Sequence, residues 1–226
     1  MKGFSISIDG PDGAGKSTLS KLLAKELKKN FPEKNVILIK PSYFSESNGG
    51  KKIEKEFIDI SHKLVKHSRE HNSYFLRAMR INYEELVVPA VTRGEIVILD
   101  SSEIRALAFI MDKGDDEAIQ ETTELITNNT LTSNFKSDYR FFIYGEIDDL
   151  LKNLYGKKNL DSGDPINYQE SVRRIECYQK AIKMICGTNL INYIKIEHTH
   201  CDSVESYLLK VIKRCILPKL FSSVII

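Results

Sequence analysis

The stretch FSISIDGPDGAGKSTLSKLL, residues 4–23, decides the fold expected for this chain. It begins with an apolar run over residues 4–8, which is typical of a buried β-strand. A glycine-rich turn follows, and Leu19, Leu22 and Leu23 then recur at the spacing of one helix face. The sequence therefore predicts a strand, a tight turn and a helix in immediate succession.

The turn matches the phosphate-binding pattern G-x-x-x-x-G-K-[ST], and its flanks supply the strand and the helix that this pattern requires. Its glycines let backbone N–H groups surround phosphate oxygens, and the first turn of the helix adds a positive dipole end. Lys16 supplies a charge for the β and γ phosphates. A glycine turn that binds nothing would not explain Lys16 and Ser17 at their offsets. We therefore expect ATP, a nucleoside triphosphate, to be held by Gly10, Pro11, Asp12, Gly13, Ala14, Gly15, Lys16, Ser17 and Thr18.

The same pattern predicts a magnesium site. The Ser17 hydroxyl is one expected ligand, and a second is usually a carboxylate at the end of a neighbouring strand. The run EIVILD ends in Asp100, which meets that requirement. Asp100 has an alternative role as the N-cap of the next helix, although Ser101 or Ser102 would serve there equally well. We expect Ser17 and Asp100 to bind Mg²⁺.

Short β-rich runs alternate with longer segments of helical period along the chain, which indicates βα units and a parallel sheet. The expected architecture is a three-layer α/β fold of the P-loop NTPase type, with a five-stranded parallel sheet flanked by helices and a small lid. The predicted strands are 4–8, 35–40, 95–100, 139–145 and 191–197. The predicted helical segments are 19–27, 51–70, 73–92, 103–127, 147–155, 167–186 and 204–215.

Length and composition set the broad class. The 226 residues favour a single domain over 1–226, with the lid at about residues 153–168 inside it. Apolar residues make up 42% and charged residues 28%, and the formal net charge of +2 gives no sign of a nucleic-acid or membrane partner. The cysteines lack C-x-x-C spacing and no signal peptide is evident, so we expect a cytoplasmic protein. The apolar C-terminal LFSSVII is expected to be a buried tail or a contact surface, which leaves a homodimer open.

Four stretches, in order, resemble the thymidylate kinase family, whose members phosphorylate dTMP with ATP. They are DGPDGAGKSTL, then YFLRAMRINYEELVVPAVTRGEIVILD, then LDSSEIRALAF, and finally SDYRFFIYGEIDDLLKNLYGKKNLD followed by YQESVRRIECYQKAI. Only the first stretch is highly specific alone, so the order of the four carries the resemblance. It implies a nucleotide kinase of nucleotide biosynthesis, a monophosphate acceptor and a lid that closes during transfer.

The resemblance also implies roles for particular residues. Asp12 would contact the sugar of the acceptor nucleotide, and Phe75 would stack on its base. Arg80 is the nearest match to the arginine that binds the acceptor phosphate in the family, with the alternative that Phe75 belongs to the core and Arg80 to the solvated surface. Phe109 lies where the family has an aromatic residue of the substrate site.

The chain departs from the family at two charged positions. Ser101 stands where an arginine follows the strand-end aspartate, and Arg105, one helical turn on, is the expected substitute. The lid offers Lys157 and Lys158 in place of arginines. These lysines would act with Lys16, Asp12 and Arg105 in catalysis, with the alternative that they are exposed and contact nothing. Because of these departures, two alternatives stay open: a nucleoside or other small-molecule kinase, and a nucleotide-binding accessory protein with weak or no transfer.

Two groups of histidines have spacings that bear on metal binding. His67 and His71 have i,i+4 spacing on a predicted helix, but no H-E-x-x-H pattern accompanies them, so a solvated helix face is expected. The segment His198 to Cys201 holds three possible ligands in four residues, too close together for a local zinc site. We expect no metal at either place.

Overall fold

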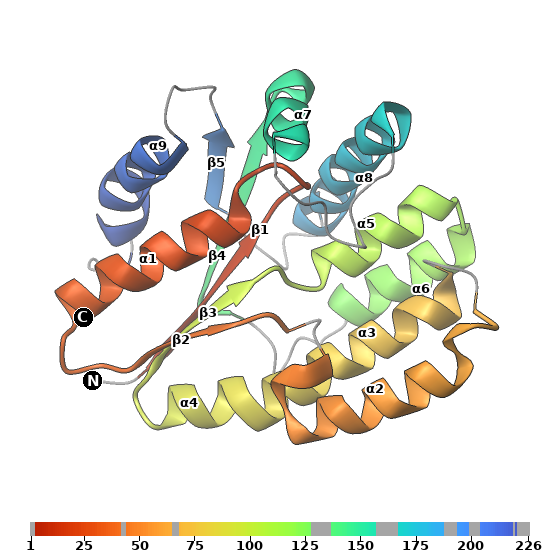
Figure 1. The fold of residues 1–226 in the computed structure, drawn as a ribbon, viewed down its shortest axis with the longest axis horizontal. Coiled ribbons are helices and arrows are strands. Elements are labelled where there is room, and N and C mark those ends of the chain that lie inside the picture. Colours follow the sequence, from red (N-terminus) through yellow and green to blue (C-terminus); the bar gives the residue numbers. More distant parts are fainter. Residues whose placement is uncertain are drawn as a thin grey trace.

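Five strands form one sheet in the order β2-β3-β1-β4-β5, and all neighbouring strands are parallel (Figure 1). The structure is a computed structural model that describes residues 3–41, 44–64, 68–127, 137–156, 167–187, 194–198, 204–218 and 220. The five-stranded parallel α/β fold expected from the sequence is thereby confirmed. The strands are β1 (Phe4–Asp9), β2 (Val36–Ile39), β3 (Ile96–Asp100), β4 (Tyr139–Gly145) and β5 (Ile194–His198).

The helices follow the predicted helical segments, with local differences. The helix predicted over 51–70 ends at Ser61, and the next helix begins at Arg69. Segment 103–127 forms two helices, because Gly114 ends the first in the left-handed conformation at φ 70°. Segment 73–92 stays helical through Pro89, which lies in the first turn of a new helix where its missing N–H costs nothing. The α-helices are α1 (Lys16–Asn30), α2 (Asn48–Ser61), α3 (Arg69–Asn82), α4 (Val88–Thr92), α5 (Ile104–Lys113), α6 (Asp116–Thr127), α7 (Ile147–Tyr155), α8 (Tyr168–Gly187) and α9 (Val204–Val211), with shorter turns η1 (Phe44–Glu46), η2 (Tyr83–Val87) and η3 (Ile212–Ile216).

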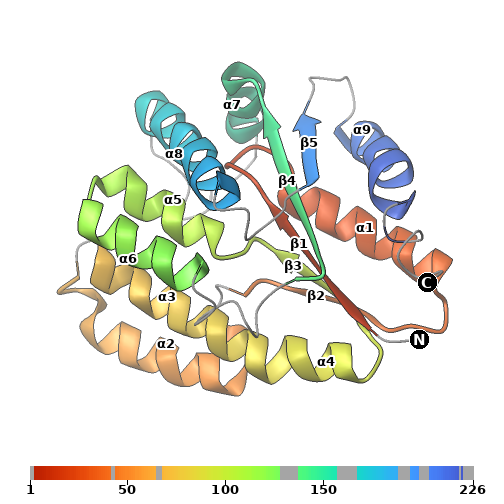
Figure 2. The ribbon, with the colours of Figure 1, turned by 180° about the vertical axis from the view of Figure 1, so that it is seen from behind.

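The sheet is covered on both faces. In the buried strand β3, Ile96 and Ile98 face the core formed with α1, α7 and α9, whereas Val97 and Leu99 face the core under η2 and α4. Helices α5, α6 and α8 cover the rest of the second face (Figure 2). Burial on both faces explains why β3 is a continuous apolar run and does not alternate.

The parallel pairing brings two aspartates to one edge of the sheet. Ile8 lies opposite Asp100 in the register of β1 and β3, so Asp9, the last residue of β1, is close to the end of β3. The phosphate loop leaves β1 at this same edge. Ligands of open α/β sheets bind beyond the carboxyl ends of the strands, so this edge is the candidate site.

The lid predicted at about residues 153–168 falls largely outside the described residues, and so do Lys157 and Lys158. Its two described flanks are joined, because the hydroxyl groups of Tyr155, at the end of α7, and Ser171, in the first turn of α8, are 2.9 Å apart and hydrogen-bonded. The division of the chain into one domain with a lid stays a prediction.

Candidate nucleotide and phosphate site

The phosphate loop is a tight turn that only glycine fits at two places. Gly13 has φ 84°, and a Cβ atom on it would lie 2.1 Å from the carbonyl oxygen of Leu150 in α7. At Gly10, φ is 152° and a Cβ atom would lie 2.5 Å from the carbonyl oxygen of Ile143. The loop is closed by a hydrogen bond of 3.2 Å from the Ala14 N–H to the Pro11 carbonyl. The backbone of the loop is therefore seated directly against β4 and α7.

Lys16 begins α1 and folds back under the loop. Its Nζ donates a hydrogen bond of 2.8 Å to the Pro11 carbonyl and lies 3.8 Å from Oδ1 of Asp12. Burial lowers the pKa of Lys16, the Asp12 carboxylate opposes that effect, and the nearby positive charge of Arg105 adds to it. Two cations are thus held close together at a loop whose form is typical of anion binding.

Ser17 and Asp100 are brought together as predicted for a metal pair. The Ser17 hydroxyl donates to Oδ2 of Asp100 at 2.7 Å, and Nζ of Lys40 lies 3.9 Å from the same oxygen. Asp100 does not cap α5, because that helix begins only at Ile104 and has no side-chain cap. Hydroxyl and carboxylate oxygens are the ligands that Mg²⁺ prefers, and Mg²⁺ commonly takes only one or two carboxylates. The pair therefore fits Mg²⁺, and the described residues hold no group of three or more His, Cys, Asp or Glu that suggests another metal.

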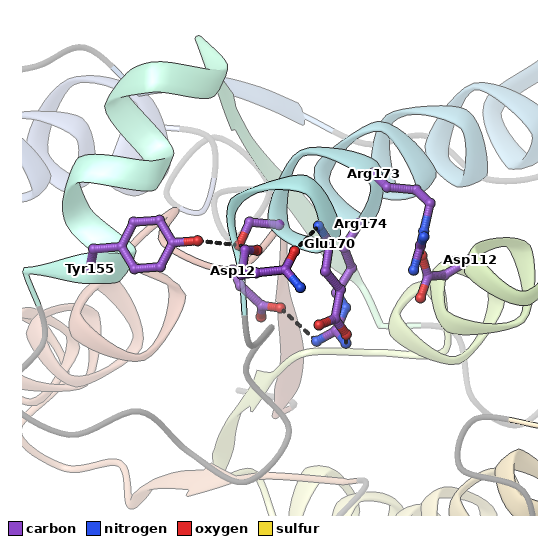
Figure 3. A network of polar contacts seen from close by, with 8 residues as sticks. Asp12, Asp112, Tyr155, Glu170, Arg173 and Arg174 are labelled. Atoms are coloured by element: carbon purple, nitrogen blue, oxygen red, sulfur yellow. Dashed lines mark hydrogen bonds and ion pairs between the residues drawn. The ribbon is translucent and has the colours of Figure 1, made fainter.

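Arg174 of α8 is a site residue that the sequence reasoning missed. Its side chain is 2% exposed, its Nη1 lies 3.6 Å from Oδ2 of Asp12, and its Nη2 donates to Glu170 at 2.8 Å (Figure 3). Oδ2 of Asp12 is buried and accepts no hydrogen bond from the described residues. The Tyr178 hydroxyl, one helical turn beyond Arg174, is likewise buried without a described partner, and burial raises the pKa of Tyr178 well above its ordinary value. Unused hydrogen-bonding groups in a buried site are available to a ligand.

Arg105 and Arg174 share one aromatic ring. The guanidinium carbon of Arg105, in the first turn of α5, lies 5.2 Å from the ring centroid of Phe109, and that of Arg174 lies 4.9 Å from it. Guanidinium groups are attracted to ring faces at such distances. The Phe109 ring thus contacts one arginine from α5 and one from α8, and the charge of Arg105 also acts on Lys16.

The turn after Asp100 is held by a carboxylate. Ser102 donates both its N–H and its hydroxyl to Asp9, at 2.7 Å and 2.8 Å. Burial, and next the charge of Glu103, raise the pKa of Asp9 to about 6, and the hydrogen bonds from Ser102 oppose this. Between the two bonded strand ends, Ser101 takes φ 80°, a left-handed conformation that costs about 1–2 kcal/mol for a residue with a Cβ.

Phe75 and Arg80 of α3 make their contacts with residues other than those above. Phe75 is packed in an aromatic cluster, with ring centroids 5.0 Å from Phe44 and 5.1 Å from His71. Arg80 is 56% exposed and forms an ion pair of 3.1 Å with Glu84. Phe75 is partly buried and Arg80 is exposed, and their proposed contacts with the acceptor stay predictions.

Thr18 is exposed in the first turn of α1. His71 belongs to the aromatic cluster, while His67, the His198 side chain, His200 and Cys201 fall outside what the structure describes. Among the described residues, no helix is long and apolar enough to cross a membrane.

The parallel sheet, the phosphate loop and the arginines beside it define the class of P-loop nucleotide kinases. A family model described as thymidylate kinase matches residues 8–198. The chain therefore belongs to the thymidylate kinase family.

Two curated relatives are the thymidylate kinases of Mycoplasma mobile and Mesomycoplasma hyopneumoniae strain J. The first is 30% identical over 142 residues, which is 61% of this chain and 64% of that protein. The second is 33% identical over 132 residues, which is 55% of this chain and 59% of that protein. The chain thus matches less than two thirds of the length of either relative.

Two solved structures share the fold. The thymidylate kinase of Ehrlichia chaffeensis superposes with a TM-score of 0.62 at 19% identity, covering 94% of this chain and 98% of that one. The thymidylate kinase of Candida albicans gives 0.56 at 20% identity, covering 94% and 92%. These similarities support the fold, and the site rests on the geometry described above.

Proposed function

We propose that the chain is an ATP-dependent nucleotide kinase that transfers the γ-phosphoryl group of ATP to a nucleoside monophosphate, with dTMP as the favoured acceptor. The observation that carries the proposal is the position of Asp12. This carboxylate belongs to the phosphate loop, yet it lies within 4 Å of both Lys16 and Arg174, two cations suited to phosphate. The choice of dTMP rests on membership of the thymidylate kinase family.

In this proposal the loop and Lys16 hold the donor. The backbone N–H groups of the loop and the α1 N-terminus bind the phosphates of ATP, and Lys16 neutralises charge on the β and γ phosphates. Ser17 and Asp100 hold Mg²⁺, which neutralises charge on the phosphates when it is bound. Positioning and electrostatic stabilisation are sufficient for this chemistry, because phosphoryl transfer needs no protein nucleophile.

Where the family has a phosphate-binding arginine after the strand-end aspartate, this chain has Ser101. In the proposal, Arg105 and Arg174 bind phosphate oxygens in its place. An oxygen of the acceptor phosphate forms a bond to the γ-phosphorus while the bond from that phosphorus to the bridging oxygen of ADP breaks. Two guanidinium groups at Phe109 would bind oxygens of the acceptor and of the transferring group, and Asp12 would accept a hydrogen bond from the acceptor sugar. Lys157 and Lys158 would add charge from the lid.

The cellular location and the binding partners belong to the same proposal. A cytoplasmic location is supported by Cys177, a free and buried thiol. We further propose that the partner is a small nucleotide and not a nucleic acid, since the formal net charge is only +2. A homodimer is compatible with the proposal and is not required by it.

The test is ADP formation by the purified protein with Mg²⁺ and ATP against a panel of nucleoside monophosphates and nucleosides. We expect turnover with dTMP above the other monophosphates. Turnover with a nucleoside in place of a monophosphate would support the nucleoside kinase alternative. Tight ATP binding without turnover on any acceptor would overturn the proposal and favour an accessory protein.

A further inference from the structure

A side chain links the ends of β1 and β3 in addition to the backbone pairing of the sheet. Both carboxylate oxygens of Asp9 accept hydrogen bonds from Ser102, at 2.7 Å from its N–H and 2.8 Å from its hydroxyl. Both side chains are buried, Asp9 at 1% and Ser102 at 4% exposure. We call this pair of hydrogen bonds the Asp9–Ser102 clasp.

The clasp directly follows Ser101, whose left-handed backbone conformation is unfavourable for a residue with a Cβ atom. Ser101 is the one non-glycine residue with positive φ, at 80°, in the described part of the chain. It is also held by a hydrogen bond of 3.0 Å from its N–H to the Ile8 carbonyl, directly before Asp9. A left-handed serine persists only where its surroundings dictate its conformation, and such residues cluster at functional sites.

The other side of Ser101 is Asp100. Its carboxylate accepts the hydrogen bond from Ser17 at 2.7 Å, in the pair assigned above to Mg²⁺. The direction in which Asp100 leaves the strand is set by the backbone between it and Ser102. A carboxylate on β1 therefore fixes a turn that begins at the predicted metal ligand on β3.

We propose that Asp9 and Ser102 are positioning residues for Asp100: the Asp9–Ser102 clasp holds the left-handed turn at Ser101 and so keeps Asp100 facing Ser17 for Mg²⁺ binding. Neither residue touches the metal. The inference rests on the proposed function only in taking Ser17 and Asp100 as the Mg²⁺ pair. The competing explanation is that Asp9 merely satisfies a buried turn before α5, in which case its loss would change stability alone.

The test compares ATP affinity in the presence of Mg²⁺ with ATP affinity in the presence of EDTA, by calorimetry on the full chain. Ser102→Ala removes the hydroxyl contact and keeps the backbone hydrogen bond. Residues that orient metal ligands typically change metal affinity by 10- to 100-fold when they are replaced. We therefore expect Ser102→Ala to raise the Mg²⁺ concentration for half-maximal ATP binding about tenfold, with metal-free ATP affinity unchanged.

Two further variants sharpen the test. Asp9→Asn can still accept from the Ser102 N–H and contact its hydroxyl, so its Mg²⁺ requirement should rise less than that of Ser102→Ala. Ser7→Ala is the matched control, because Ser7 lies two residues earlier on β1 and its buried hydroxyl has no described hydrogen-bond partner. We expect Ser7→Ala to leave both affinities unchanged.

Equal loss of ATP affinity with and without Mg²⁺ in Ser102→Ala would overturn the inference, and so would no loss in either condition. Thermal unfolding of each variant confirms that the protein measured is folded. The outcome is separable from that of the proposed function, since ATP binding needs no acceptor. Normal Mg²⁺-dependent ATP binding without acceptor turnover would refute the proposed kinase and leave the clasp standing.

Discussion

Arg174 is held between two carboxylates, with Nη1 at 3.6 Å from Asp12 and Nη2 at 2.8 Å from Glu170. The first carboxylate belongs to the phosphate loop and the second to the same helix as Arg174, one turn earlier (Figure 3). The arginine is nearly inaccessible to solvent, so its guanidinium is oriented before any substrate arrives. Such preorganisation is the main source of electrostatic stabilisation in enzyme sites.

Replacing Arg174 with lysine should therefore lower turnover with dTMP by about 10²-fold or more, because lysine keeps the charge but cannot span both contacts. Arg173→Lys is the matched control: the neighbouring arginine points away from the site to Asp112 and is 57% exposed. Its turnover should stay within about twofold of wild type, because lysine keeps the positive charge beside the buried Asp112 carboxylate and the pair does not include a residue of the site. Steady-state kinetics on both variants decides the matter, and a larger loss in Arg173→Lys would contradict the assignment.

Lys16→Ala should abolish most transfer. The lysine supplies the charge nearest to the loop, and loss of one such group in a dry site typically costs about 10²- to 10³-fold in turnover. The measurement is ADP formation at saturating Mg²⁺ and ATP. Lys21→Ala, an exposed lysine later on α1, serves as the control and should behave as wild type. Equal activities in the two variants would remove Lys16 from the mechanism.

Arg105→Ala and Arg80→Ala separate two candidates for the acceptor phosphate. Arg105 lies against Phe109 beside Lys16, whereas Arg80 is exposed and paired with Glu84. Loss of a charge-assisted hydrogen bond is worth about 1.5–3 kcal/mol, so Arg105→Ala should raise KM for dTMP about tenfold or more. Arg80→Ala should leave it nearly unchanged. The reverse result would restore Arg80 to the role that the family resemblance implied.

Asp9→Asn should change how stability depends on pH. The pKa of Asp9 is about 6 in the folded protein and 3.8 in the unfolded reference, so between these values the folded state binds the extra proton. Stability then falls as pH rises from about 4 to about 6, and the loss above this window is up to about 3 kcal/mol. Asparagine does not titrate, so Asp9→Asn lacks this loss. The free energy of unfolding of Asp9→Asn minus that of wild type, measured in urea, should therefore increase between pH 4 and pH 6.5. Curves that stay parallel over that range would show that Asp9 titrates normally.

Ser101→Gly and Ser101→Ala test the left-handed turn. Glycine adopts φ 80° without the clash that a Cβ creates, while alanine keeps that clash and loses the hydroxyl. Ser101→Gly should be more stable than Ser101→Ala by about 1 kcal/mol, measured as the difference in free energy of unfolding. If alanine is as stable as glycine, the turn is relaxed and not strained.

The sequence predicted the parts of the site that lie within one segment. Lys16 and Ser17 have fixed offsets in a single loop, and Asp100 ends an apolar run, so periodicity and spacing were sufficient to bring them together. The five strands could also be predicted, because each is a short apolar run within one segment. Local pattern also explains Arg80, whose i,i+4 partner Glu84 indicates an exposed helix face.

Arg174 could not be chosen over Arg173 from spacing alone, because adjacent helical residues point about 100° apart and the rotation of α8 is set by tertiary packing. One signal was present: Arg174 lies on the same stripe as the buried Tyr178. An arginine on an apolar stripe is either paired or functional. The cluster around Phe75 was hidden for a similar reason, since its partners come from η1 and α2.

The close contact of the phosphate loop with β4 and α7 restricts which substitutions the chain can accept during evolution. Asp12 and Lys16 are separated by a short covalent segment that is pinned where Gly10 and Gly13 meet neighbouring backbone. The segment is supported from far along the chain, because Gly10 meets Ile143 of β4 and Gly13 meets Leu150 of α7. Substitutions that move β4 or α7 would therefore change the support of the segment that carries Asp12 and Lys16. The fold itself persists through extensive divergence of sequence, since the thymidylate kinase of Ehrlichia chaffeensis superposes with a TM-score of 0.62 at 19% identity.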